Sequence, residues 1–260
     1  MSGSEEEFVM ELTLLHLYPD AMSLYGEYAN LSVLRRVLEL MGVEVTVRSV
    51  GLDDTPDFSD AGLIYMGAGT ERSQKWALEA LRPHVQPLKE AVERGVPLLF
   101  TGNAMELLGS AITDQSGRVW PGLALAAFET REGERRTVED VVAHTPLWQA
   151  PVVGFMNKCS ATQGVTTPLF AQLSLGTGNC PGEQGEGYVE GNVIATHLAG
   201  PVLVKNPAFL NWLVGRMAAF QGWTLPEPLP QLPYQHQAYD VTVKELTARA
   251  GGHHGERSSV

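Results

Sequence analysis

The chain has 260 residues, of which 44% are hydrophobic and 18% are charged, and its formal net charge is −12. This composition is that of an ordinary globular protein, and the length is enough for one large domain with a substantial core. The negative charge argues against a general binder of nucleic acid or anionic membranes, because phosphate groups would repel it.

The chain has no sequence signal for export or membrane insertion. No apolar run approaches the roughly 18 residues that cross a bilayer. The first residues, MSGSEEEFVM, lack the basic and apolar regions of a secretion signal, and we expect residues 1–9 to be a disordered acidic leader. Two cysteines, Cys159 and Cys180, cannot form a disulfide framework. These features favour a cytoplasmic location.

The first half of the chain alternates apolar runs with helical spacing. Strands are predicted at 11–18, 43–50, 61–66 and 96–100. Between the first two, one helical face carries four apolar residues, and Gly42 then ends the helix; the four are Leu31, Leu34, Leu38 and Met41.

A second helical pattern covers residues 71–94, with possible interruptions near Pro83 and Pro87, and 103–109 reads as a helix start closed by Gly109. Alternating strands and helices over residues 11–110 predict an α/β fold, a doubly wound and mostly parallel sheet flanked by helices.

The second half is expected to add antiparallel strands to one side of this sheet. Short strand candidates follow one another without long helices between them, at 123–128, 137–144, 150–155, 186–191 and 192–198. An amphipathic closing helix is predicted at 206–220, with Phe209, Leu210, Leu213 and Met217 as its buried face.

We expect residues 10–222 to form one domain and residues 223–260 to form a C-terminal extension. The tail is Pro-rich from Leu225 and then polar, and His253-His254 lie in what reads as a flexible end. His16 and His84 stand alone and offer no ligand spacing, so we predict no metal site and no cofactor.

The most informative segments are LLFTGNAMELLG (98–109) and ATHLAGPVLVKNP (195–207). A strand that runs into a tight turn and a helix is a nucleophile elbow, which presents its turn residue at the carboxyl end of the sheet. The helix N-terminus there lowers a thiol pKa and offers N–H donors to an oxyanion. The turn residue, however, is Gly102.

The Gly-rich turn Gly67-Ala68-Gly69 follows the neighbouring strand and would form the opposite wall of such a site. Its small residues would let the backbone approach a bound substrate. An ordinary connection between strand and helix would look the same.

Several segments, taken in order, resemble the GatD proteins, a family of class I glutamine amidotransferases of the cobyric acid synthase type. LYPDAMSLYGEYAN (17–30) is similar to the family's opening, and MGAGTERSQ (66–74) to its Gly-Gly-Gly loop and the Asp-Arg-Glu-Gln that follows. LLFTGNAMELLG stands where the family has Cys-Gly-Gly-Tyr-Gln-Leu-Leu-Gly, and THLAGPVLVKNP where it has Thr-Tyr-Leu-His-Gly-Pro. The resemblance covers residues 11–220.

This resemblance implies a glutaminase that supplies ammonia to a partner, MurT, a Mur-ligase-like ATP-dependent enzyme. In the family, a Cys attacks the glutamine carboxamide and a His acts as base and acid. The pair amidates the D-glutamate of the lipid II stem peptide, a step of cell-wall synthesis. We therefore expect a heterodimer with a MurT-like subunit.

The catalytic residues of the family do not carry over. The nucleophile position is Gly102 and the base position is Ala199. Asn103 and Ala68 replace glycines of the family beside the expected reaction centre. The family's Asn-His-Gly-Gly becomes Asn157-Lys158-Cys159-Ser160, and the basic residue that holds glutamine aligns with Arg136, or with Arg135.

The primary interpretation is a pseudo-amidotransferase subunit that does not hydrolyse glutamine, because neither thiol nor imidazole stands at the catalytic positions. Positions expected to line a ligand pocket are Gly67, Ala68, Gly69, Asn103, Arg136 and Asn157. One alternative is a working glutaminase with a relocated nucleophile, Cys159, served by His197. Another is a free-standing sensor that binds glutamine or a related small molecule.

Overall fold

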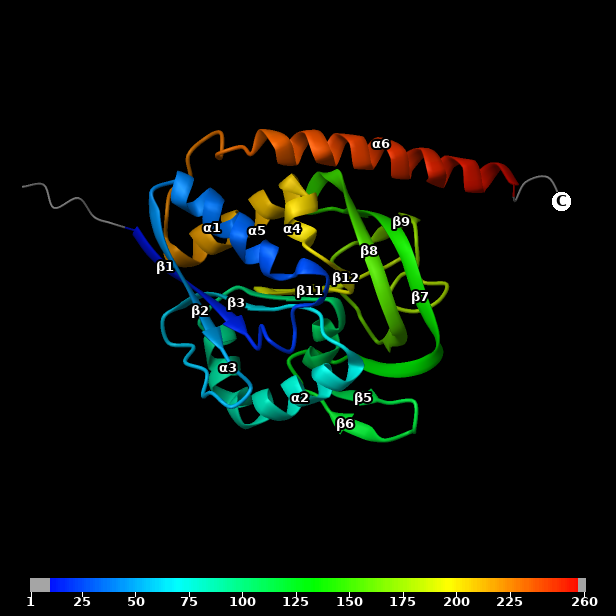
Figure 1. The fold of residues 1–260 in the computed structure, drawn as a ribbon, viewed down its shortest axis with the longest axis horizontal. Coiled ribbons are helices and arrows are strands. Elements are labelled where there is room, and N and C mark those ends of the chain that lie inside the picture. Colours follow the sequence, from blue (N-terminus) through cyan, green and yellow to red (C-terminus); the bar gives the residue numbers. More distant parts are fainter. Residues whose placement is uncertain (1–9, 257–260) are drawn as a thin grey trace, which may run out of the picture.

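The computed structural model describes residues 10–256 and the side chains of residues 10–251. The acidic leader expected at residues 1–9 lies outside the described residues. Two sheets form the scaffold, with helices around the first of them (Figure 1).

The first sheet has the strand order β10-β11-β4-β3-β1-β2, and all neighbours are parallel except β10 and β11. Its strands are β1 Met10–Leu17, β2 Val43–Val50, β3 Ala61–Met66, β4 Leu98–Thr101, β10 Tyr188–Glu190 and β11 Val193–Thr196. The central strands β1, β3 and β4 are apolar on both faces because helices cover both faces.

Figure 1 shows α2 and α3 on one face of this sheet and α1, α4 and α5 on the other. The helices are α1 Tyr28–Leu40, α2 Glu71–Leu81, α3 Val85–Glu93, α4 Val202–Lys205, α5 Pro207–Gln221 and α6 Pro233–Glu256. Two apolar cores result, one on each face of the sheet. The predicted doubly wound α/β fold is confirmed.

Most local predictions about the helices are also confirmed. Leu31, Leu34 and Leu38 are buried on α1, and Gly42 follows the helix at φ +83°. Met41 follows the last residue of α1 and is only partly buried. A 3-10 turn around Pro83 divides the predicted 71–94 helix into α2 and α3, whereas Pro87 lies in the first turn of α3 and does not interrupt it. The predicted face of α5 is buried at all four positions, Phe209, Leu210, Leu213 and Met217.

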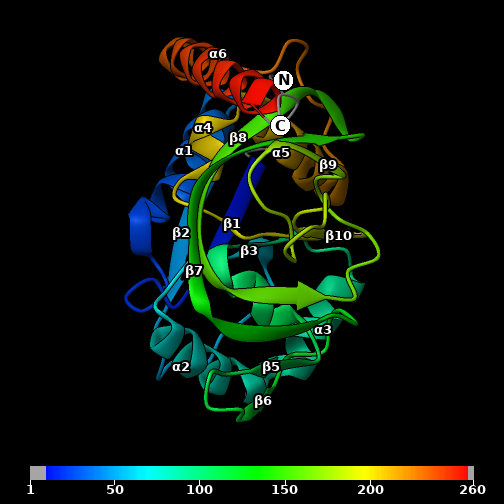
Figure 2. The ribbon, with the colours of Figure 1, turned by 90° about the vertical axis from the view of Figure 1, so that its right-hand side faces the viewer.

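Most strands of the second half form a second, mixed sheet rather than extending the first. The candidates at 186–191 and 192–198 do join the first sheet, but β11 runs parallel to β4 rather than antiparallel as expected. The order of the second sheet is β12-β8-β7-β5-β6, and β9 also pairs with β7. The bounds are β5 Ala111–Thr113, β6 Val119–Pro121, β7 Glu129–Thr145, β8 Trp148–Gln163, β9 Gln172–Leu175 and β12 Leu198–Ala199. Figure 2 shows β7 and β8 as one long curved hairpin that reaches from α6 to β5.

Two further predictions about this half were wrong. The segments 137–144 and 150–155 are not short strands but parts of β7 and β8, with 17 and 16 residues. The segment 123–128 is a loop, whose N–H groups at Leu123 and Leu125 donate to the carbonyls of Leu107 and Leu108. Its apolar residues are spaced as in a strand, but they pack beneath the elbow instead.

The C-terminal region is also more ordered than the sequence suggested, because α6 reaches Glu256 and includes positions 253 and 254. Leu246 packs with Val142 and Val153 of the hairpin, and Tyr239 and Val243 lie against this cluster. Tyr239 also donates to the carbonyl of Pro151 at 2.7 Å. Apolar residues four and three positions apart explain the helix, a spacing the polar composition concealed. No helix in residues 10–256 is long and apolar enough to span a bilayer.

Candidate functional site

The elbow predicted from the sequence is present. Strand β4 ends at Thr101, and a 3-10 helix, Gly102–Leu108, follows directly instead of the expected α-helix start. Gly102 is buried and has φ +60°, a left-handed conformation that side chains other than glycine seldom adopt. The chain thus keeps the left-handed backbone of an elbow, which glycine adopts without strain, at a position that carries no reactive group.

The Gly-rich turn after β3 faces this elbow. A Cβ atom added to Gly102 would overlap the Cβ atom of Ala68, so a side chain at 102 and the methyl group of Ala68 exclude each other. Gly67 cannot carry a side chain either, because its Cβ would lie 2.6 Å from the Cβ of Glu27. Gly69 is packed against the carbonyl of Ala21, 2.8 Å from where its Cβ would stand.

Asn103 joins the elbow to the Gly-rich turn. Its Oδ1 accepts the N–H of Gly69 at 2.9 Å, and its Nδ2 donates to the carbonyl of the same residue at 2.9 Å. The carbonyl of Asn103 accepts a hydrogen bond from Gln74 Nε2 at 2.6 Å. The backbone of the turn is therefore already bonded where a substrate would approach it.

Ala199 lies in the short strand β12, opposite Phe155 of β8, and is buried. It lines the same cavity as Gly102, so the fold brings together the two positions expected to carry base and nucleophile. Gly200 follows with φ +78°. Its N–H donates at 2.8 Å to the carboxylate of Glu27.

Glu27 is a hub that the sequence interpretation missed. Its buried carboxylate accepts four hydrogen bonds, from Asn30, Tyr65, Thr101 and Gly200. Thr101 precedes Gly102 and Gly200 follows Ala199, so one carboxylate ties together the segments that carry both catalytic positions. Burial raises the pKa of Glu27 to about 7, against the opposing effect of these hydrogen bonds. Only its place in the resembling segment 17–30 could have marked it.

The cavity between the walls has a volume of about 280 Å³. It is lined by five of the six predicted ligand positions, Ala68, Gly69, Asn103, Arg136 and Asn157. Gly67 lies behind the wall and is not among the lining residues, and Arg135 is not among them either.

The outer wall keeps polar groups. Arg136 forms an ion pair with Glu71 and donates at 2.9 Å to Asn157 Oδ1. Asn157 in turn donates at 2.8 Å to the hydroxyl of Tyr25, whose ring lies edge-on to Phe155 with 5.8 Å between centroids. Tyr25 therefore lines the cavity while remaining 47% exposed.

Cys159 and His197 do not form a nucleophile and base pair. Cys159 lines the cavity, and its thiol donates to Glu71 Oε1 at 3.2 Å. Burial, together with this hydrogen bond, raises the pKa of the thiol to about 11. His197 is buried, with Nδ1 3.2 Å from Glu186 Oε1, and burial lowers its pKa.

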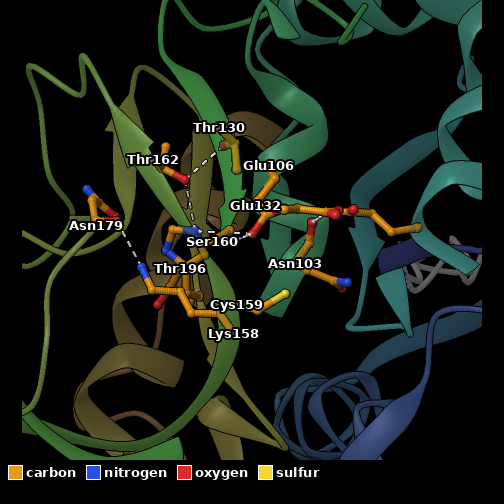
Figure 3. A network of polar contacts seen from close by, with 12 residues as sticks. Asn103, Glu106, Thr130, Glu132, Lys158, Cys159, Ser160, Thr162, Asn179 and Thr196 are labelled. Carbon is orange, nitrogen blue, oxygen red and sulfur yellow. Dashed lines mark hydrogen bonds and ion pairs between the residues drawn. The ribbon is translucent and has the colours of Figure 1, made fainter. Parts of the chain in front are cut away.

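A polar network lines the cavity and continues into the protein interior beneath it (Figure 3). Glu106 accepts hydrogen bonds from Gln74, at 2.7 Å, and from Ser160. Lys158 Nζ donates to the carbonyls of Gly178 and Asn179, at 2.9 Å each, and burial lowers its pKa. None of these groups occupies the place of the missing thiol or imidazole.

Comparison with known proteins agrees with this architecture. A family model for the CobB/CobQ-like glutamine amidotransferase domain matches residues 13–207. The GatD subunit of lipid II isoglutaminyl synthase (glutamine-hydrolyzing) from Staphylococcus aureus is 28% identical over 212 residues, 82% of this chain and 86% of the relative. The subunit of the same name from Streptococcus pneumoniae is 26% identical over 209 residues, 79% and 80% of the two chains.

Two crystal structures of glutamine amidotransferases share the fold. One, from Thermotoga maritima, has a TM-score of 0.50 and 8% identity, covering 92% of this chain and 94% of that one. The other has a TM-score of 0.52 and 14% identity, covering 78% and 98%. The predicted resemblance to GatD proteins is confirmed by the sequence relatives. Since the family model covers three quarters of the sequence, on the fold of glutamine amidotransferases, the chain belongs to the CobB/CobQ-like glutamine amidotransferase family.

Proposed function

We propose that this chain is a GatD-type subunit of an amidating complex and does not itself hydrolyse glutamine. One observation carries the proposal: the cavity brings Gly102 and Ala199 together, and neither position supplies a nucleophile or a base. Covalent amide hydrolysis needs both groups within reach of one carbonyl carbon.

The buried cysteine beside the cavity gives little support to a relocated active site. A thiol with a pKa of about 11 holds very little thiolate at neutral pH, and the Cys159 thiol already donates to Glu71. His197 is bonded to Glu186 rather than to Cys159. The alternative of an active glutaminase therefore lacks an activated nucleophile.

The relatives give the proposed setting. Both are named as subunits of lipid II isoglutaminyl synthase, and they cover about four fifths of this chain. We infer that the partner is a MurT-like, Mur-ligase-family enzyme in the cytoplasm, which amidates the D-glutamate of lipid II in cell-wall synthesis. With no glutaminase beside it, the ligase would take free ammonium, and this chain would position or stabilise it.

Two measurements test the proposal. The isolated chain should release no glutamate from glutamine above the buffer rate, and release that Cys159→Ser abolishes would establish the relocated nucleophile instead. The chain should co-purify with the MurT-like ligase, and the complex should amidate its acceptor with ammonium but not with glutamine. A chain that binds glutamine but never the ligase would be the free-standing sensor.

A further inference from the structure

We propose that this chain fills its own reaction centre. The carboxamide of Asn103 occupies the subsite that would hold the carboxamide of a glutamine substrate, and the methyl group of Ala68 occupies the space of a nucleophile's Cβ atom. This inference rests on the proposed function, because a site without chemistry can tolerate permanent occupation.

The bonding of Asn103 supports the first half of the proposal. A primary carboxamide, the reacting group of glutamine, offers one acceptor oxygen and a donor NH₂ group. Asn103 presents the same group from the position directly after the elbow, and both its ends are bonded to Gly69, at 2.9 Å each. A ligand carboxamide would have to displace this pair before it could use the same backbone groups.

The place of these bonds also matters. Elbow-type sites stabilise the oxyanion with the N–H of the residue after the nucleophile and an N–H from a neighbouring loop between strand and helix. Gly69 lies in such a loop, between β3 and α2, and its N–H is bonded to Asn103. The side-chain amide of Gln74 donates to the main-chain carbonyl of Asn103 and to the carboxylate of Glu106. These bonds fix the backbone that carries the Asn103 carboxamide.

The packing of the Gly-rich turn supports the second half. Gly67 and Gly69 are in close contact with Glu27 and Ala21, which leaves position 68 as the residue of the three that carries a side chain. Its methyl group is in the space that a Cβ at Gly102 would need. Ala68 and Gly102 thus fit each other, and a change at one position alone is unfavourable.

The remaining cavity shows which part of the site is filled. About 280 Å³ stays open between Gly102 and Ala199 at the base of the cavity and Arg136 and Asn157 on the outer wall. Asn103 and Ala68 therefore narrow the base of the cavity around Gly102 and leave its outer part open. The protein should accept L-glutamine at the carboxamide subsite only when the Asn103 side chain is removed.

Calorimetric titration with L-glutamine tests the occupation by Asn103. We expect Asn103→Gly to bind at least about tenfold more tightly than the wild type, a gain set by freeing one donor and one acceptor. Asn157→Ala is the matched control, because it removes another carboxamide of the cavity and should give no gain. The Gly69 amide resonance should shift on titration in Asn103→Gly and stay unchanged in the wild type.

The outcomes that overturn the proposal are clear. The proposal is wrong if Asn103→Gly, shown to be folded by its thermal melt, binds L-glutamine no more tightly than the wild type does. If Asn103→Gly fails to fold, Asn103→Ala keeps the backbone less flexible and carries the same expectations.

A double-mutant cycle on melting temperature tests the fit of Ala68 to Gly102. Gly102→Ala should lower Tm more in the wild type than in an Ala68→Gly background, by roughly 2–10 °C, since overpacking is relieved only in the second. Additive changes would overturn the fit. Neither experiment involves turnover or the partner, so failure here leaves the proposed function intact, whereas turnover by the wild type would refute the proposed function and, with it, this inference.

Discussion

The two walls of the cavity differ in what they have kept. The inner wall, at the end of the parallel sheet, has the backbone of an elbow, and its polar groups are bonded to one another through Asn103. The outer wall, formed by the curved hairpin and by the turn Leu24–Gly26 before α1, keeps a guanidinium, an amide and a phenol in Arg136, Asn157 and Tyr25. Backbone geometry follows from the packing of the sheet and persists without chemistry, whereas polar groups at an entrance suggest retained binding.

The largest effect is expected from variants that rebuild a catalytic site on the inner wall. Gly102→Cys with Ala199→His should still turn over glutamine very slowly, because each missing oxyanion donor costs about 10²–10³ in rate. Adding Ala68→Gly and Asn103→Gly should raise glutamate release by roughly 10² or more. The control is the variant that carries the other three substitutions but keeps Gly102, and it should be inactive.

A double variant that already works as fast as the fourfold variant would mean that Asn103 and Ala68 do not obstruct the inner wall. The measurement is glutamate release under saturating glutamine.

The second effect concerns the carboxylate of Glu27, which joins the segments that carry Gly102 and Ala199. Glu27→Ala should lower the free energy of unfolding by about 3 kcal/mol, because it leaves buried donors at Thr101, Tyr65 and Gly200 without an acceptor. Urea denaturation measures the loss. Glu27→Gln keeps the shape and one acceptor oxygen and should lose less. Equal losses in the two variants would show that the hydrogen-bonded network contributes little.

Glu27 also predicts a pH dependence. Its folded pKa of about 7 lies above the ordinary value of 4.5, so the folded state binds the extra proton between these two values. The stabilising contribution is present below about pH 4.5 and is lost as pH rises through about 7. We expect unfolding free energy to fall on the order of 2 kcal/mol across this window. The slope should be smaller in Glu27→Gln, and an identical slope would assign it to other groups.

The sequence predicted the inner wall well because the elbow depends on local patterns. An apolar strand, a glycine and a following turn are contiguous, so positions 98–109 could be interpreted together. Gly102 at φ +60° agrees with the expected tight turn. Ala199 reached the same cavity as expected from the resemblance alone, since no local pattern connects it to Gly102.

The sequence predicted the outer wall poorly because its geometry depends on pairs distant in the chain. The register of β7 against β8 shifts between Glu132 and Thr137, which alternation of apolar and polar residues cannot reveal. The hydrogen bond from Asn157 to Tyr25 joins residues 132 positions apart. On the inner wall, the hydrogen bonds of Asn103 to Gly69 could not be predicted either. The sequence does not reveal whether an asparagine side chain in a turn bonds the neighbouring loop or points away from it.

The smallest effect on stability is expected from Tyr25→Ala, which tests whether the outer wall contacts a partner protein. Tyr25 is 47% exposed and Tyr28 is 63% exposed, so both could contact a ligase, but only Tyr25 packs on Phe155 and bonds Asn157. Tyr25→Ala should lower Tm by only about 2–4 °C, the loss of roughly one aromatic contact. It should weaken association with the MurT-like subunit roughly tenfold or more, as expected of an interface tyrosine.

Tyr28→Ala is the matched control for this prediction, because it removes a more exposed tyrosine three residues away without disturbing the cavity. If both variants weaken association, the surface around the start of α1 is the interface, and the cavity wall is part of it. If Tyr25→Ala strongly lowers Tm while association is unchanged, Tyr25 stabilises the hairpin instead. The outer wall would then owe its polar groups to folding, and its contrast with the inner wall would no longer indicate retained binding.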